Sequence, residues 1–178
     1  MFRRVLFRSY FGLGDEKRVE LVAEDARWYL ANSPDRYDMI AIDLYVTGHI
    51  PFFTTTAEFF REVYDHLTED GVMMMNVLAV AQPEELLGPL VRTVRLSFPS
   101  TFLTGAGNFI LIASRSPLSL ATLKERLERA GPSPEVRQVA RRALNGLSAA
   151  SAGREWPIFT DDLNDVEFRT FRTFYGGF

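Results

Sequence analysis

The sequence predicts an α/β protein with a mostly parallel sheet, because short apolar runs alternate with helical segments along its first half. Residues 18–23 (RVELVA), 39–42 (MIAI) and 72–78 (VMMMNVL) are apolar runs of strand length, as expected of strands that a parallel sheet covers on both faces. Helices are predicted at 26–33 and from Thr55 onward. A strand, helix and strand in succession are typical of right-handed parallel units.

Composition narrows the class of protein. The chain has 178 residues, of which 47% are apolar and 24% charged, a balance typical of one soluble globular domain. Its net charge of −3 argues against a nucleic-acid binder, which needs a basic face to neutralise phosphates. Cysteine is absent, and His49 and His66 are too few and too separated for a zinc site, so no metal is expected. Without a long apolar run or a signal-peptide pattern, a cytoplasmic location is expected.

Two of the predicted strands end on aspartates, Asp25 and Asp43. In open α/β sheets, ligands bind outside the carboxyl ends of the strands, so both carboxylates are candidate site residues. Asp25 is also placed to cap the helix predicted at 26–33. For Asp43, the alternative is a turn-forming or helix-capping role.

Asn76 interrupts the third apolar run near its carboxyl end. Its side chain is either paired within the core or directed into the same crevice as Asp43. Between these two residues, Thr55 and Glu58 have the spacing of a capping box, which predicts a helix beginning there. Residues 69–71 (EDG) are predicted to close that helix.

The second half of the chain is predicted to supply packing elements. The pattern indicates a helix at 83–97 and an antiparallel hairpin with strands at 101–104 and 108–114. Leucine and valine at helical spacing predict amphipathic helices at 118–130 and 134–147.

The two ends of the chain differ from the rest. Residues 1–10 (MFRRVLFRSY) have no strand or helix period and no capping signal, so they are predicted to be a non-native or disordered leader, with a frayed basic helix turn as the alternative. Residues 11–178 are predicted to form one domain. After a polar linker at 148–154, the tail carries acidic residues whose spacing does not match a calcium loop, which predicts a solvated loop or a metal-free cap. These residues are Asp161, Asp162, Asp165 and Glu167.

Four stretches, in this order, resemble the catalytic domain of spermidine synthases, the polyamine aminopropyltransferases, and especially the spermidine synthase-like domains found in bacteria. They are residues 10–30 (YFGLGDEKRVELVAEDARWYL), 36–43 (RYDMIAID), 51–78 (PFFTTTAEFFREVYDHLTEDGVMMMNVL) and 159–167 (FTDDLNDVE). The resemblance implies a Rossmann-like sheet of the class I methyltransferase type and an S-adenosyl-type co-substrate. It further implies a small-molecule amine substrate, and it allows a homodimer or a fusion to a membrane segment in the parent protein.

The resemblance also assigns roles to individual residues. Asp25 would contact the adenine edge of the co-substrate, and Ala26 would leave room for the ring. Asp43 would hold and deprotonate the attacking amine of putrescine, which arrives as an ammonium and must lose a proton to become nucleophilic. Tyr45, in the same loop, and Asn76 are further candidates for substrate binding. The implied donor is decarboxylated S-adenosylmethionine, or S-adenosylmethionine itself for methyl transfer.

Two departures from the family pattern change what is expected of this chain. Val46 stands where the family carries a second aspartate, which permits a different acceptor. A glycine-rich loop following a first strand has no counterpart, since FGLG at 11–14 precedes a predicted strand. We therefore expect a domain truncated at its amino end, inactive in isolation, that binds S-adenosyl ligands weakly and self-associates through an open strand edge at 18–23.

Three functions are compatible with these observations. The first is aminopropyl transfer from decarboxylated S-adenosylmethionine to a diamine, and the second is methyl transfer from S-adenosylmethionine on the same fold. The third is a non-catalytic nucleotide-binding or regulatory domain. Val46 favours the last two functions, whereas Asp43 and the ordered motifs favour a retained ligand chemistry.

Overall fold

A computed structural model of the chain describes residues 19–20, 22–129, 131 and 133–175. The polypeptide divides into two compact units, Met1–Ser33 and Pro34–Phe178, and each is considered by itself. The leader predicted at residues 1–10 lies outside the described residues.

In the first unit, α2 (Ala26–Asn32) forms where the sequence predicts a helix. Asp25 caps it as predicted, because its Oδ1 accepts hydrogen bonds from the backbone N of Arg27 at 3.1 Å and of Trp28 at 3.0 Å. The strand predicted at 18–23 is wrong for the part that can be described, where every residue is exposed and outside any strand. A strand depends on hydrogen bonds to a neighbour, and no described strand pairs with this stretch.

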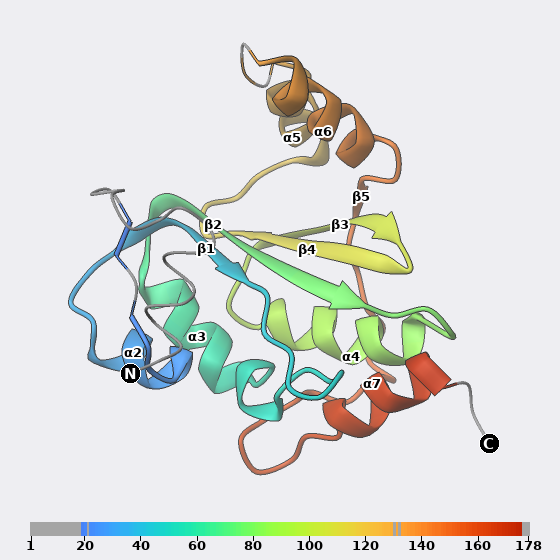
Figure 1. Cartoon of the computed structure of the whole chain (residues 1–178). Coiled ribbons are helices and arrows are strands. Elements are labelled where there is room, and N and C mark those ends of the chain that lie inside the picture. The colour runs from blue at the N-terminus through green and yellow to red at the C-terminus, as the bar shows by residue number, and fades with distance from the viewer. Residues whose placement is uncertain (1–18, 21, 130, 132, 176–178) are drawn as a thin grey trace, which may run out of the picture. The chain divides into compact units, whose positions relative to one another are not determined.

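The second unit contains a five-stranded mixed sheet of order β1-β2-β4-β3-β5. β1 and β2 run parallel, as Figure 1 shows, and the other neighbours are antiparallel. This confirms the predicted α/β class and the hairpin, here formed by β3 and β4, while β5 lies within the predicted linker. The strands are β1 (Tyr37–Ile42), β2 (Leu67–Leu78), β3 (Ser100–Ala106), β4 (Asn108–Ser114) and β5 (Ser148–Ala149).

β1 lies at the edge of this sheet, which corrects the prediction of a strand buried on both faces. Ile42 is buried, but Met39 is 56% exposed, because it pairs with Val72 on the face of the sheet opposite to the buried Met73. β2 has a strand on each side and buries Met73, Met75 and Val77. The core of the unit is therefore centred on β2.

β2 also begins earlier than the sequence predicts. Residues 69–71, predicted to close a helix, lie inside the strand, because Leu67 already pairs with Tyr37 of β1. Their polar side chains suit an irregular segment, because the register of β1 against β2 shifts here and residues 68–71 lie between the pairs Tyr37–Leu67 and Met39–Val72. The preceding helix, α3 (Ala57–Asp65), ends at His66.

The capping box predicted at the start of α3 is wrong. The N-cap is Thr56, whose Oγ1 accepts a hydrogen bond from the backbone N of Phe59 at 3.2 Å. The Thr55 hydroxyl instead donates to the Phe52 carbonyl in the short helix η1 (Phe52–Thr54), at 2.8 Å. The Glu58 side chain binds the tail instead: its Oε2 accepts a hydrogen bond from the backbone N of Asp161 at 3.1 Å.

Helices α3, α4 (Glu84–Val94) and α7 (Val166–Tyr175) lie on one side of the sheet, with α4 in contact with the other two (Figure 1). α7 is a helix that the sequence does not predict, and its first turn includes Glu167 of the acidic cluster predicted to be a solvated loop or a metal-free cap. The predicted amphipathic pair, α5 (Leu120–Glu128) and α6 (Pro134–Leu144), packs as a hairpin, and α6 also contacts β3. None of the helices in the described part of the chain is long and apolar enough to cross a membrane.

The tail crosses α4 at Gly88. A Cβ atom at this position would lie 2.5 Å from Cε2 of Trp156, so the absence of a side chain lets the indole pack against the helix. One turn further on, Arg92 donates to the carbonyl oxygens of Arg154, at 2.9 Å, and Trp156. Phe159 is then fully buried, and its backbone N donates to Thr93 Oγ1 at 2.9 Å. The tail is thus fixed along α4.

Gly88→Ala is expected to destabilise the protein, although alanine is the better helix former. At a helix position open to solvent the change stabilises by about 1 kcal/mol, but here the new methyl group displaces Trp156. We expect urea unfolding to show a loss of about 1–3 kcal/mol. In a Trp156→Ala background the same change is expected to stabilise, and a stabilising Gly88→Ala in the wild type would contradict this packing.

Candidate functional site

The candidate site lies at the carboxyl ends of the two parallel strands. Ile42 of β1 is paired with Met75 of β2, so the next residues, Asp43 and Asn76, come side by side. Asn76 Nδ2 donates a hydrogen bond to Asp43 Oδ1 at 2.9 Å. Because an ionised carboxylate only accepts hydrogen bonds, this contact fixes which way the amide faces.

Tyr45 joins the same edge through its hydroxyl group. Its Oη accepts from the backbone N of Leu78 at 2.7 Å and donates to the carbonyl of Asn76 at 3.3 Å. Burial raises the pKa of the Tyr45 phenol above its ordinary 10.0, the hydrogen bond from Leu78 opposes this, and the negative charge of Asp43 adds to it. The hydroxyl is therefore neutral at physiological pH and keeps its proton to donate.

A tight turn follows Tyr45. Val46 and His49 exchange backbone hydrogen bonds at 2.9 and 3.1 Å. The two residues between them have positive φ, 49° at Thr47 and 89° at Gly48, as a type I′ turn requires. Glycine suits its position in this turn, but a β-branched threonine rarely adopts positive φ, so the sequence pattern does not predict the turn.

An open pocket of about 330 Å³, within the size range of small-ligand sites, is lined in part by Asn76, the hydrogen-bond partner of Asp43. Asn76 Oδ1 is buried and has no hydrogen-bond partner in the described part of the chain. A buried acceptor of this kind costs stability unless something donates to it, so it marks a position for a donor. The pocket is lined by Tyr45, Gly48, Asn76, Leu78 and Asn108.

Asn108 is a pocket residue that sequence reasoning missed. It is the first residue of β4 and pairs with Leu78, the last residue of β2. This antiparallel register brings it to the carboxyl end of β2, next to Asn76. The available signal was a polar residue directly after the glycine of the predicted hairpin turn.

The structure brings together three of the candidates, Asp43, Tyr45 and Asn76, in the second unit. Asp25 and Ala26 belong to the first unit, where Asp25 caps α2. No group of three or more residues with metal-binding side chains occurs among the residues that the structure describes.

Comparison with known proteins identifies the family. The model of the spermine/spermidine synthase domain matches residues 2–103 of this chain. The chain belongs to the spermine/spermidine synthase family. A probable polyamine aminopropyl transferase of Bifidobacterium longum is 41% identical over 59 residues, which are 33% of this chain and 13% of the relative. Polyamine aminopropyltransferase 2 of Pseudomonas aeruginosa is 31% identical over 99 residues, 54% of this chain and 28% of that protein.

Solved structures show the same fold. A probable spermidine synthase from Corynebacterium glutamicum superposes with a TM-score of 0.59 at 20% identity, over 85% of this chain and 61% of that one. Human methyltransferase-like protein 13, in complex with SAH, superposes with a TM-score of 0.56 at 21% sequence identity. The match covers 85% of this chain and 69% of that one. A spermidine synthase in complex with the transition state analogue AdoDATO also has a TM-score of 0.56, at 21% sequence identity. The match covers 77% of this chain and 52% of that one. The sheet is thus of the class I methyltransferase type that spermidine synthases use.

Tyr45→Phe is expected to change how stability depends on pH. The raised pKa means that the folded state holds the phenolic proton more tightly than the unfolded state. This contribution is complete below pH 10.0 and is lost as the pH rises through the folded-state pKa. The variant is expected to lose about 1 kcal/mol at neutral pH, because the Leu78 N–H loses its acceptor.

Urea unfolding between pH 7 and 11 checks this expectation about Tyr45. The stability of the wild type should fall more steeply above pH 10 than that of the variant, and the matched control is Tyr64→Phe. Tyr64 packs against Phe98 and Arg115, and its hydroxyl has no described partner. Identical pH profiles for the wild type and Tyr45→Phe would contradict the assignment.

Proposed function

We propose that this chain carries the acceptor site of an aminopropyltransferase, which transfers an aminopropyl group from decarboxylated S-adenosylmethionine to a small amine such as putrescine. The observation that carries the proposal is the buried Asn76 Oδ1, which has no hydrogen-bond partner among the described residues, beside the Asp43 carboxylate. An ammonium group has three N–H donors and a positive charge, so it matches an anionic acceptor and a neutral acceptor side by side.

Asp43 is proposed to bind the attacking nitrogen and take up its proton. An ammonium has no lone pair for attack, so a base within hydrogen-bond reach is required. The exposed position of Asp43 suits this role, because the released proton can pass on to solvent. Asn76 holds one carboxylate oxygen through Nδ2 and leaves the other available. The ring of Tyr45 forms a pocket wall, and its hydroxyl ties the Asp43 loop, residues 43–56, to the end of β2.

For the donor, Asp25 and Ala26 of the first unit are proposed to contact the adenine ring. Oδ1 of Asp25 caps α2, whereas Oδ2 has no described partner and suits the exocyclic amino group of an adenine. Ala26 presents a single methyl group beside it. When bound, the donor would supply an electrophilic carbon on a positively charged sulfur, and this sulfur would leave as a neutral thioether as the amine nitrogen bonds to the carbon. The complexes of two structural neighbours with SAH and AdoDATO support this class of ligand.

A second candidate function is methyl transfer from S-adenosylmethionine. It is favoured by Val46, 54% exposed, at the position where the family carries its second aspartate, and by the likeness to a methyltransferase-like protein. With valine at this position, the Asp43 loop offers a diamine one carboxylate, whereas the family pattern offers two. The identity of the donor separates the two functions.

We also propose that residues 11–178 form one domain of a cytoplasmic homodimer.

The test is a product assay on the chain, alone and extended upstream in its reading frame, with mass spectrometry as the readout. Putrescine is supplied with decarboxylated S-adenosylmethionine or with S-adenosylmethionine. We expect the extended form to give aminopropylated product from the first donor. Asp43→Asn is expected to lower kcat/KM by about 100-fold or more, because it removes the base.

The matched control for the assay is Asp38→Asn. This residue lies in the same strand, near its other end, and accepts a hydrogen bond from Thr68 Oγ1 at 2.9 Å. Its activity should stay within about twofold of wild type, since it makes no contact with the pocket. A methylated product would favour the second function, and an Asp43→Asn variant as active as Asp38→Asn would contradict both.

A further inference from the structure

The tail of the second unit contacts the two loops that border the candidate site. The first is the Asp43 loop, and the second, residues 79–83, follows β2 just beyond Asn76 and Leu78. From the carboxyl half of α7, the carbonyl of Thr173 accepts a hydrogen bond from the backbone N of Ala81 in the second loop at 3.0 Å. The segment before α7 and its first turn contact the Asp43 loop.

Asn164, two residues before α7, makes the main contact with the Asp43 loop. Its Nδ2 donates to the carbonyl of Phe52 at 3.0 Å and to Oγ1 of Thr55 at 2.9 Å. Its Oδ1 accepts from the backbone N of Val166, the first residue of α7, at 2.9 Å. A single side chain thus both caps the helix and binds the loop.

Two further contacts lie on either side of the Asn164 contacts, one at the tight turn of the loop and one at the first residue of α3. Glu167 Oε1 lies 3.8 Å from His49 Nε2, next to the pocket residue Gly48. The carbonyl of Phe159 accepts from the backbone N of Ala57, at the start of α3, at 2.8 Å. The tail therefore binds the Asp43 loop from its tight turn to the first residue of α3.

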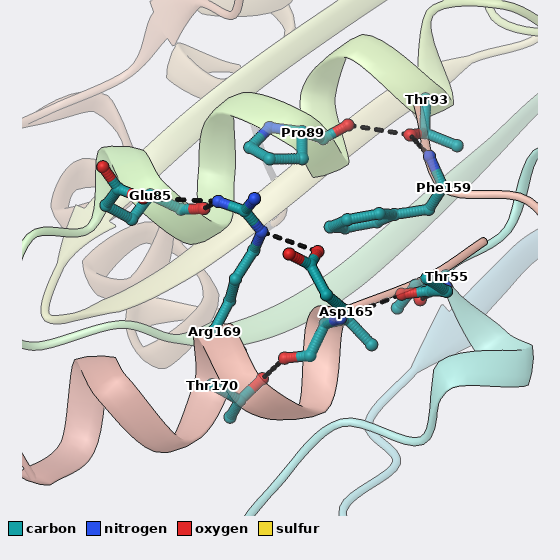
Figure 2. Close-up of polar contacts among 10 residues, drawn as sticks. Thr55, Glu85, Pro89, Thr93, Phe159, Asp165, Arg169 and Thr170 are labelled. Carbon is teal, nitrogen blue, oxygen red and sulfur yellow. Dashed lines mark hydrogen bonds and ion pairs between the residues drawn. The ribbon is translucent and has the colours of Figure 1, made fainter. Parts of the chain in front are cut away.

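Arg169 fixes α7 itself against α4. Pro89 has no N–H, so the carbonyl of Glu85, four residues earlier in α4, lacks its usual helical donor. Arg169 Nη1 fills this gap at 2.9 Å and reaches Glu85 Oε2 at 3.3 Å, while its Nε donates to Asp165 Oδ1 at 2.7 Å, as Figure 2 shows. The side chain is 16% exposed, so these bonds are largely shielded from water.

We infer that Asn164 is a positioning residue for the acceptor site: its amide holds the Asp43 loop, and Arg169 anchors the helix that carries it. The part that concerns the acceptor rests on the proposed function. The part that concerns the loop rests only on the contacts described. Neither residue touches the pocket, so each acts through the loop.

Hydrogen exchange tests the hold on the loop in the full chain. Asn164→Ser and Asn164→Asp both lose the Nδ2 donors, but each keeps an oxygen able to cap α7. The Thr54 and Thr55 amides, which bond to carbonyls within the loop, are expected to exchange roughly 3- to 10-fold faster. In Asn164→Asp, α7 should stay as protected as in the wild type.

The matched control is Asp162→Ser, in the same tail segment, where the exposed carboxylate has no described partner. Its loop amides should exchange at the wild-type rate. Unchanged loop exchange in both Asn164 variants overturns the inference. So does equal acceleration of the loop and α7 in Asn164→Asp, because Asn164 would then be a helix cap alone.

Calorimetric titration with putrescine tests the link to the acceptor. The Kd is expected to rise roughly 3- to 10-fold in both Asn164 variants and to stay unchanged in Asp162→Ser. Faster loop exchange with an unaltered Kd overturns the positioning role. If the wild type binds no putrescine, the proposed function fails, and the exchange rates alone decide whether Asn164 holds the loop.

Discussion

The hydrogen bond from Asn76 to Asp43 is the interaction on which the site depends. It joins the ends of two strands that are parallel, and parallel pairing is what brings both residues to the same edge. The bond uses one oxygen of the carboxylate and the amino group of the amide, so an anionic and a neutral acceptor remain for a ligand. The Tyr45 hydroxyl stabilises the same edge by hydrogen bonds with the backbone of Asn76 and Leu78 in β2. The pocket is thus built mainly from secondary structure, with one short loop closing it.

The tail gives this edge its second support. A proline inside α4 leaves a free carbonyl, which a helix would normally satisfy internally. Arg169 of α7 satisfies it instead and brings two carboxylates to the same point. The carbonyl of Glu85, left without a helical donor in α4, is therefore a specific binding point for α7. Since the tail also binds the Asp43 loop, α4 and the candidate site are connected through α7.

Sequence patterns predict those parts of the structure that depend on near neighbours. Asp25 as a cap, the β3–β4 hairpin and the α/β class follow from local spacing, and the family follows from ordered motifs. The strand at 18–23 and the early start of β2 could not be predicted this way, because pairing with another strand decides both. Among the three consecutive threonines 54–56, tertiary contacts select the cap. α7 was missed because its acidic first turn suggested a loop, and Arg169 pairs with Asp165 only once the helix exists.

The side-chain amide of Asn76 reports most directly on the central claim, that an amine binds between this residue and Asp43. The measurement is a titration of the ¹⁵N-labelled chain with putrescine, followed by NMR at the Asn76 Nδ2 resonances, in the wild type and in Asp43→Asn. The account predicts a saturable shift in the wild type, and a much weaker response once the carboxylate is neutral. A wild-type Asn76 amide that does not respond at saturating putrescine, or that responds equally in Asp43→Asn, would contradict it.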